Sequence, residues 1–405
     1  MRTNRVVLTG LGVISSIGIG VPEFTDGLRS GRSGVRPITV FDTTGFASGN
    51  GCEVTDFRPE HWIRTMPVGE LGRASRFSVA AARMAVRDAG TDEQTLRDRR
   101  GLISIGTTDG EAHELDTLTE SELAGGSALD PLLARRAVAS RLATEVAREL
   151  RLSDVEIMTV GTACAAGNYS IGDGFDAVRA GEVDFAICGG ADAICRKTFA
   201  GFYRLGTIAP EHCQPFDVDR KGILTGEGAG VVFMETVDSA LARGARIYAE
   251  VLGWGLNCDA FHPVAPDQDS VARCVELALA DAGITPDQVD LISAHGTGTK
   301  VNDVSETKAI RQVYGDRPPP TVSLKSMLGH TMGAASAIGA VACSLAITHG
   351  FIPPTINHVR TDPECAIDCV PNEAVAAELD IVQNNGLAFG GNNAVVILGR
   401  HRERS

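Results

Sequence analysis

Three segments of the chain combine reactive side chains with glycine-rich turns. The first, residues 159–171, runs from an apolar, strand-like stretch through small residues and places Cys164 where a helix should begin. The N-terminus of a helix offers free N–H groups and the positive end of the dipole, which stabilise a thiolate. The other two segments, 295–299 and 325–330, each put a histidine just after a predicted strand. A nucleophilic thiol with two turn-borne imidazoles is the set of groups that acyl-thioester chemistry needs.

The other cysteines give this thiol its context. The chain has ten cysteines, and cysteine is also a common small core residue. They form neither a disulfide framework nor paired CxxC motifs, which predicts a reducing cytoplasm without structural disulfides or zinc. Cys365 and Cys369 have no matching second pair, so we expect no metal site.

The two histidines differ from an ordinary structural histidine in their surroundings. His295 and His330 each follow a strand-like run and have glycine as a neighbour. Neutral imidazoles that donate N–H to one thioester oxygen would stabilise an enolate. No acidic residue has comparable surroundings, which argues against a plain thiol hydrolase. The histidines expected to be structural or exposed are His61, His113, His349 and His401.

The elements that position these segments follow an internal duplication. Five stretches recur in the same order, although any α/β chain repeats strand–helix units. The pairs are 6–12 with 249–255, 77–90 with 271–283, 102–106 with 291–295, 159–171 with 321–338, and 228–233 with 390–397. Strands that alternate with helices predict an α/β fold with two largely parallel sheets and a shared central helical layer. We divide the halves at 1–247 and 248–405.

Composition restricts the classes of partner. The chain has 405 residues, 43% of them hydrophobic, and a formal net charge of −14. This charge argues against nucleic acid or an anionic membrane as partner. A strand-like run begins at Val6, so we expect no leader segment. The apolar run 332–347 is shorter than the roughly 20 residues of a bilayer span and predicts a buried helix.

Taken together, the motifs resemble one family over the whole chain. They are Thr162-Ala-Cys-Ala-Ala-Gly167, Pro215-Phe-Asp217, Gly226-Glu-Gly-Ala-Gly230, His295-Gly-Thr-Gly-Thr299, Lys325-Ser-Met-Leu-Gly-His330 and Phe389-Gly-Gly391. The chain resembles the β-ketoacyl-acyl carrier protein synthases of the thiolase fold, especially the synthase II type and the ketosynthase subunits of type II polyketide systems. The resemblance implies a five-layered αβαβα arrangement and decarboxylative condensation of an acyl group with malonyl-acyl carrier protein.

The resemblance also implies roles for individual residues. Cys164 would hold the acyl group, while His295 and His330 would drive decarboxylation. Backbone N–H groups of Cys164 and Phe389 would form the oxyanion hole, with Gly390 permitting a tight turn beside it. Phe389 would swing as a gate between acyl loading and malonyl entry, although a packing role alone is the alternative.

Four further polar residues belong to the same expectation. Lys325 follows an apolar run and should be buried, where an unpaired ammonium is costly, so Glu306 is its expected partner. By resemblance this pair organises the histidines. Thr297 and Thr299 would hydrogen-bond the amides of a pantetheine arm, or would only stabilise their turn.

The chain departs from the family pattern in two places. Ala165 and Ala166 follow the nucleophile, where the family commonly has hydroxyl residues. Segment 107–114 is unusually polar where the family lines its acyl pocket from both subunits. These departures leave the acyl chain open and favour a dedicated polyketide over fatty-acid synthesis.

The expected partner is acyl carrier protein, an acidic domain that brings its own phosphopantetheine, so no cofactor is expected on this chain. Docking of an acidic domain requires arginines near the tunnel mouth. The candidates are Arg64, Arg73, Arg76 and Arg204, with Arg135 and Arg136 behind them. The family forms dimers, which predicts a homodimer or a heterodimer with a chain-length-factor-like subunit.

Three other functions have to be weighed. A non-elongating chain-length factor would not need the complete Cys-His-His set. A degradative thiolase would have a second reactive cysteine in a C-terminal Cys-x-Gly turn, where this chain reads Phe389-Gly-Gly-Asn-Asn393. A variant acyltransferase or malonyl decarboxylase of the same fold stays open because of segment 107–114.

Overall fold

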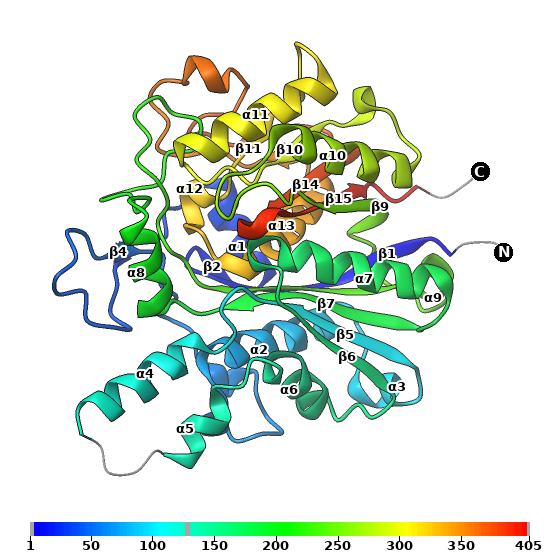
Figure 1. Cartoon of the computed structure of the whole chain (residues 1–405). Coiled ribbons are helices and arrows are strands. Elements are labelled where there is room, and N and C mark those ends of the chain that lie inside the picture. The colour runs from blue at the N-terminus through cyan, green and yellow to red at the C-terminus, as the bar shows by residue number, and fades with distance from the viewer. Residues whose placement is uncertain (1–3, 126–129, 403–405) are drawn as a thin grey trace.

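A mixed sheet of eleven strands runs through the protein, seen here as a computed structural model that describes residues 4–125 and 130–402 (Figure 1). The first half of the chain supplies β1 (Val6–Ser15), β2 (Gly18–Ile19), β5 (Gly101–Gly106), β6 (Val155–Val160), β7 (Phe185–Asp192) and β8 (Gly228–Thr236). The second half supplies β9 (Ala249–Cys258), β10 (Leu291–Ser293), β11 (Thr321–Val322), β14 (Ile381–Leu387) and β15 (Asn392–Gly399).

The two halves of the chain have the same strand order. Setting aside β2, which pairs only with β1, the first half is ordered β6-β5-β7-β8-β1 and the second half β11-β10-β14-β15-β9. When the five strands of each half are numbered by their order in the chain, both halves place them in the sheet as third, second, fourth, fifth, first. The halves join where β1 runs antiparallel to β9, with Val6 opposite Val251. The repeated order confirms the duplication.

The expectation of two largely parallel sheets is wrong. Strand β5 is parallel to β6 and β7, and β10 is parallel to β11 and β14. Strand β8 is antiparallel to both β7 and β1, and β15 is antiparallel to both β14 and β9. Strands β1, β5 and β7 are buried along their whole length. Continuous apolar runs of this kind show that a strand is buried but not which way it runs.

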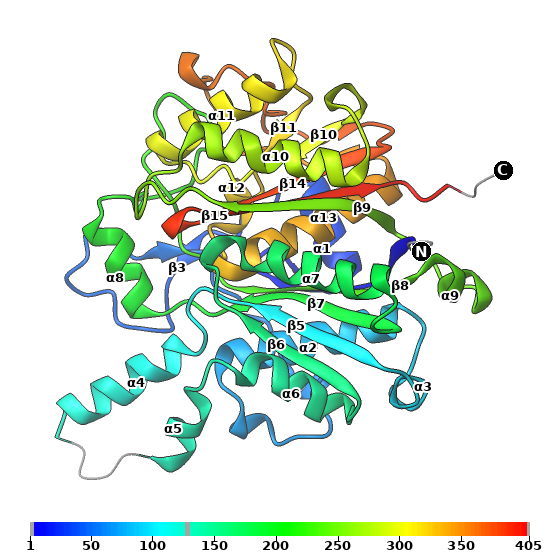
Figure 2. The same cartoon turned by 45° about the vertical axis from the view of Figure 1, so that its right-hand side comes forward.

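Helices form three layers around the two halves of the sheet (Figures 1 and 2). Helices α7 (Ala166–Ala180) and α13 (Ala335–His349) contact each other in the middle. Helices α2 (Arg73–Asp88) and α6 (Arg141–Leu150) cover the outer face of the first half. Helices α10 (Gln268–Ala282) and α11 (Lys300–Tyr314) pack together on the outer face of the second half. The five-layered α/β arrangement is therefore confirmed.

Shorter elements connect these layers. The helices are α1 (Val21–Arg29), α3 (Glu93–Arg97), α4 (Ala112–Leu123), α5 (Pro131–Arg136), α8 (Arg196–Arg204), α9 (Val237–Ala242) and α12 (Lys325–Leu328). The 3-10 turns are η1 (Pro59–His61), η2 (Val68–Glu70), η3 (Ala163–Ala165), η4 (Pro286–Gln288), η5 (Met332–Ala334), η6 (Pro363–Cys365) and η7 (Phe389–Gly391). Strands β3 (Arg36–Pro37) and β4 (Asn50–Gly51) pair with each other, as do β12 (Phe351–Ile352) and β13 (Val375–Ala376).

The most apolar helix lies at the centre of the fold. Within the described residues, Met332–His349 alone is long and apolar enough to cross a membrane, and 83% of it is buried inside the protein. The prediction of a buried helix in this region is confirmed.

The contact between the central helices depends on a glycine, which gives a first testable prediction. A Cβ at Gly167 would lie 2.5 Å from the backbone nitrogen of Ala337 and 2.7 Å from its Cβ. Gly167→Ala should therefore lower the free energy of unfolding by about 1–3 kcal/mol, measured by denaturant titration. Gly201→Ala in α8, where the added Cβ meets nothing within 4 Å, is the matched control and should cause no loss. Equal stability of the two variants would contradict this packing argument.

Candidate active site

Cys164 lies in the turn that joins β6 to the central helix α7. It belongs to η3, which leads directly into α7, so the strand–turn–helix prediction is confirmed. Ala163 has φ 49°, a left-handed conformation that is uncommon without glycine. Met332, at the matching position before α13, has φ 52°. The duplicated fold thus uses the same sharp turn twice, and the first copy carries the thiol.

The resting thiol is protonated. Cys164 is only 4% exposed, and burial raises its pKa to about 12, while the nearby charge of Lys325 acts in the opposite direction. The expected stabilisation of a free thiolate by the helix N-terminus is therefore outweighed by desolvation. The thiol must lose its proton during the reaction.

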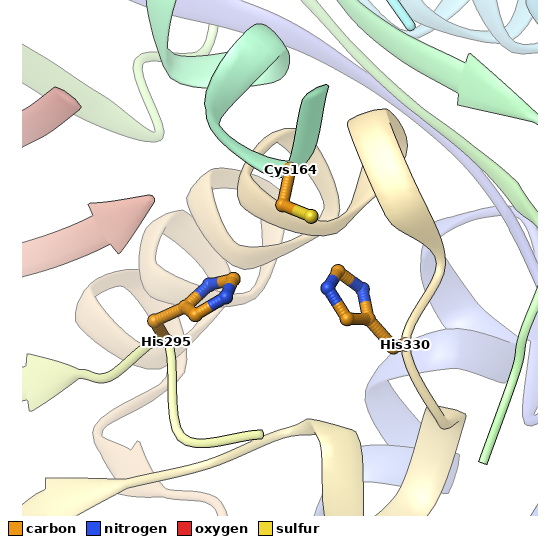
Figure 3. A group of neighbouring side chains, drawn as sticks. All are labelled: Cys164, His295 and His330. Carbon is orange, nitrogen blue, oxygen red and sulfur yellow. The ribbon is translucent and has the colours of Figure 1, made fainter. Parts of the chain in front are cut away.

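Both candidate histidines face this thiol from the second half of the chain (Figure 3). His295 follows β10, and His330 lies between α12 and η5. Their ring centres are 5.4 Å apart with planes at 80°. The Cys164 sulfur and one nitrogen of each ring lie within 4.8 Å of one another. Burial, followed by the charge of Lys325, lowers the pKa of each histidine well below its ordinary value, so both rings are neutral.

Hydrogen bonds fix the tautomer of each ring. The backbone N–H of Met332 donates to Nδ1 of His330 at 3.1 Å, so the proton of that ring lies on Nε2. The Nζ of Lys325 lies 3.4 Å from Nδ1 of His295, where an ammonium can only donate, so His295 also carries its proton on Nε2. We assign these protons from the hydrogen-bond network. The two Nε2–H groups are donors available to one substrate oxygen.

The same tautomers argue against a metal at this site. Three ligand atoms within 4.8 Å could surround an ion. A metal needs a nitrogen lone pair on each ring, and if it took Nε2 the proton would move to Nδ1. A proton on Nδ1 would then face the N–H of Met332 in one ring and the ammonium of Lys325 in the other, where only an acceptor fits. The site is built to donate hydrogen bonds.

Lys325 and Glu306 hold His295 but do not pair directly. The Lys325 ammonium is buried, as predicted, and donates to the carbonyl oxygen of His295 at 2.5 Å. Glu306 accepts from the backbone N–H of His295 at 2.7 Å and of Gly296 at 2.8 Å. In the part of the chain that the structure describes, no ion pair within 4.0 Å joins the two. The predicted direct pair is wrong because both side chains are engaged by the backbone around His295.

A cavity of about 690 Å³ opens beside the three groups. Cys164, His295 and His330 line it together with Thr297, Thr299 and Phe389. The two threonine hydroxyls hydrogen-bond each other at 2.8 Å, so each has further capacity towards a ligand. Phe389 is 38% exposed and packs against Phe202, with ring centres 5.4 Å apart and planes at 38°. Gly390, at φ 80°, turns the chain sharply beside it and donates its N–H to the carbonyl of Pro263.

The polar segment 107–114 is mostly part of the scaffold. Thr107 donates to the buried Asp192, and Glu111 accepts from the N–H groups at the start of α2. Thr108 and Asp109 instead line a second cavity of about 380 Å³ that also reaches Cys164. Of this segment, Thr108 and Asp109 are therefore the residues placed to line a pocket beside the nucleophile.

The predicted docking arginines differ in exposure and in their distance from the main cavity. Arg73 cannot dock a partner, because its guanidinium pairs with the buried Glu227 at 2.8 Å. Arg76 is half-buried in the outer helix α2, and Arg64 is exposed beside a separate small cavity. Arg204 is exposed at the end of α8, between Phe202 and Leu205, which both line the main cavity.

Two groups of residues at this cavity were missed by the sequence reasoning. Lys221 and Lys300 are exposed and line it. Arg220 and Asn302 line it as well, and Asp303 is buried behind them. Arg220 follows the Pro215-Phe-Asp217 motif by three residues, which was the available signal.

Comparisons with known proteins agree over the full length. The family model described as "Beta-ketoacyl synthase, N-terminal domain" matches residues 3–240, and the corresponding C-terminal domain matches residues 248–359. A 3-oxoacyl-(acyl-carrier-protein) synthase 2 from Synechocystis sp. is 37% identical and covers 99% of both chains.

Solved structures give the same result. A chain described as the ishigamide ketosynthase/chain length factor superposes with a TM-score of 0.98 at 62% identity, covering 99% of this chain and 100% of that chain. A type II ketosynthase solved with its acyl-carrier protein superposes with a TM-score of 0.90 at 31% identity, covering 98% and 100%.

Proposed function

Since this chain belongs to the β-ketoacyl synthase family, we propose that it is the elongating ketosynthase subunit of a polyketide system. It takes an acyl group onto Cys164 and condenses it with malonyl-acyl carrier protein. The products are 3-oxoacyl-acyl carrier protein and CO2. The observation that carries this proposal is the convergence of a buried thiol and two neutral Nε2–H donors on one cavity. The 62% identity to a chain described as a ketosynthase/chain length factor and the likeness to a type II PKS ketosynthase support the polyketide assignment.

The first half-reaction is a thioester exchange. The Cys164 sulfur attacks the acyl carbonyl carbon, and the carbon–sulfur bond to the pantetheine arm breaks. The thiol proton leaves with the pantetheine sulfur, so the exchange is balanced. Because the two thioesters are similar in energy, the protein needs mainly to position them and to stabilise the oxyanion.

The second half-reaction uses the histidines. The thioester carbonyl of the malonyl unit accepts hydrogen bonds from Nε2–H of His295 and His330. Loss of CO2 leaves its electron pair on the resulting enolate, and the two neutral donors stabilise the oxyanion. The enolate carbon then attacks the acyl carbonyl on Cys164, forming the carbon–carbon bond and releasing the thiolate. A proton from solvent restores the thiol.

The decisive experiment uses the purified chain with any subunit that copurifies. Incubation with acyl-carrier protein should add one acyl mass, and peptide mapping should locate it on Cys164. Addition of malonyl-carrier protein should then release a 3-oxoacyl product. A chain that accepts no acyl group, or accepts it without elongation, would overturn the proposal.

We also propose that the chain works as a dimer in the cytoplasm, either with a second copy or with a chain-length-factor-like subunit. Strand β6 ends the sheet, and its Ile157 and Met158 are each 41% exposed. An exposed apolar edge strand is suited to pairing with another chain. The pantetheine arm arrives on the carrier protein, and we propose no further cofactor.

Docking of the acidic carrier should depend on the basic residues at the cavity mouth. The double variant Lys221→Glu/Lys300→Glu should raise KM for malonyl-carrier protein about 10-fold, with a weaker salt dependence than the native chain. KM for malonyl-pantetheine, which lacks the protein, should change much less. Arg64→Glu, a charge reversal outside the lining of this cavity, is the matched control and should leave both values unchanged. A larger effect from Arg64→Glu would place the docking surface there instead.

A further inference from the structure

Arg220 is a buried arginine in the wall of the main cavity. Its side chain is only 1% exposed, yet the residue lines the cavity with its neighbours in 218–223. The lining also includes residues 299–302 and Thr297. Because both stretches belong to the lining, a side chain that bonds to both can set the distance between them.

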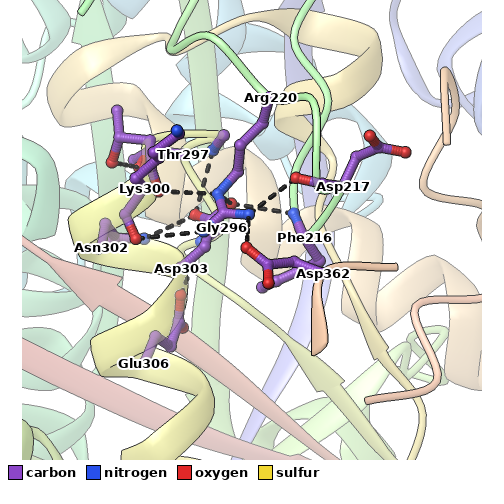
Figure 4. A network of polar contacts seen from close by, with 12 residues as sticks. Phe216, Asp217, Arg220, Gly296, Thr297, Lys300, Asn302, Asp303, Glu306 and Asp362 are labelled. Atoms are coloured by element: carbon purple, nitrogen blue, oxygen red, sulfur yellow. Dashed lines mark hydrogen bonds and ion pairs between the residues drawn. The ribbon is translucent and has the colours of Figure 1, made fainter. Parts of the chain in front are cut away.

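The guanidinium of Arg220 contacts both stretches of the lining (Figure 4). Its Nε donates to the carbonyl of Thr299 and its Nη2 to the carbonyl of Lys300, both at 3.3 Å. Its Nη1 donates to the carbonyl of Asp217 at 2.7 Å on its own side. The same Nη1 donates to Asp362 at 2.6 Å, which belongs to a third segment of the chain.

Asp303 connects this guanidinium to the turn that carries the histidine. Its carboxylate lies 3.4 Å from Nε of Arg220 and accepts from the backbone N–H of Phe216 at 2.9 Å and of Gly298 at 3.1 Å. Glu306 holds the other end of the turn at His295. The turn 295–299 is thus fixed at both ends by buried carboxylates, and Arg220 ties its far end to segment 217–220.

We propose that Arg220 is a positioning residue that fixes the width of the channel for the pantetheine arm. This inference rests on the proposed function, since the arm is the group that would pass Thr297 and Thr299 to reach Cys164. The residue acts by holding the carbonyls of Thr299 and Lys300 against segment 217–220. It leaves the thiol and the two imidazoles untouched.

The geometry requires a guanidinium. Arginine presents its donors in a planar fork, so one side chain can serve Thr299, Lys300, Asp217 and Asp362 in four directions. A lysine ammonium would keep the charge near Asp303 and Asp362 but cannot reach the same set of acceptors. Arg220→Lys therefore preserves the charge and removes the bridge.

The test compares Arg220→Lys with the native chain under steady-state conditions. KM for malonyl-carrier protein and for malonyl-pantetheine should both rise about 10-fold, while kcat falls less than threefold. The rate of Cys164 alkylation by iodoacetamide, which does not use the pantetheine contacts, should stay within twofold. An unchanged KM, or alkylation that falls in step with KM, would overturn the inference.

Two further variants keep the test decisive. Arg243→Lys is the matched control, because Arg243 is also a partly buried guanidinium that bridges Glu235 and Ala89 outside the cavity lining. It should lower stability without changing KM. If Arg220→Lys does not fold, Asp362→Asn should raise KM about threefold through the same contact. A native chain that fails to condense would refute the proposed function, whereas condensation with an unchanged KM in Asp362→Asn would refute this inference alone.

Discussion

Cys164→Ala should abolish elongation, with a fall in rate of about a thousandfold or more. The thiol is the nucleophile whose sulfur faces both imidazoles inside the cavity, and alanine leaves no atom that can hold the acyl group. Intact mass after incubation with acyl-carrier protein should show no adduct. Decarboxylation of malonyl-carrier protein should persist within about 10-fold, because the donors on His295 and His330 remain in place.

The control for Cys164→Ala is a second buried cysteine. Cys343 lies in α13, is 2% exposed and does not line the cavity. Cys343→Ala should elongate at the native rate with a modest loss of stability. Elongation by Cys164→Ala at more than a few per cent of the native rate would show that another group carries the acyl chain. The same loss in both variants would point to a folding defect instead.

The duplication explains why the site needs both halves of the chain. The turn after β6 and the turn before α13 are matching positions, each with a left-handed residue before a central helix. The first copy carries Cys164, and His330 lies just before the second copy. His295 follows β10, the counterpart of β5. Since α7 and α13 pack together, the two copies of the turn come close, and the nucleophile from one half meets the donors from the other.

Local patterns predicted the parts of the site that are local in sequence. The strand–turn–helix around Cys164 and the placement of His295 after a strand could be inferred from apolar runs and glycines. The same expectation is wrong for His330, because the short helix α12 lies between β11 and this residue. The burial of Lys325 followed from the apolar run before it. These features depend on residues within a few positions of one another, which is the range over which sequence patterns are informative.

The failures concern contacts between distant segments. The guanidinium of Arg73 pairs with Glu227, which lies 154 residues away in the chain. No local pattern around Arg73 indicates that pairing. Glu306 was expected to pair with Lys325 because a buried ammonium needs a partner, but the backbone of His295 supplies partners for each of the two. Segment 107–114 was expected to line the acyl pocket, and Thr108 and Asp109 do line a cavity that reaches Cys164, but Glu111 instead caps α2. In each case the partner is set by tertiary packing.

Removal of either histidine should separate the two half-reactions. His330→Ala and His295→Ala should each lower the condensation rate about 10²–10³-fold, the usual effect of losing one oxyanion donor. Acylation of Cys164 from acyl-carrier protein should be affected much less, because thioester exchange does not pass through the enolate. Rapid-quench mass measurements of the acyl-enzyme, followed by product formation after malonyl addition, would give the two rates separately.

Glutamine distinguishes a hydrogen-bond donor from a proton-transfer group. The side-chain amide of His330→Gln can place an N–H near the position of Nε2 but cannot act as a base near neutral pH. If His330 acts as a neutral donor, as its Nδ1 contact with Met332 and its lowered pKa indicate, glutamine should recover at least about 10-fold over alanine. Equal rates for alanine and glutamine would instead assign His330 a proton-transfer role. Decarboxylation would then not depend on the Nε2–H donor that the Met332 N–H fixes on His330.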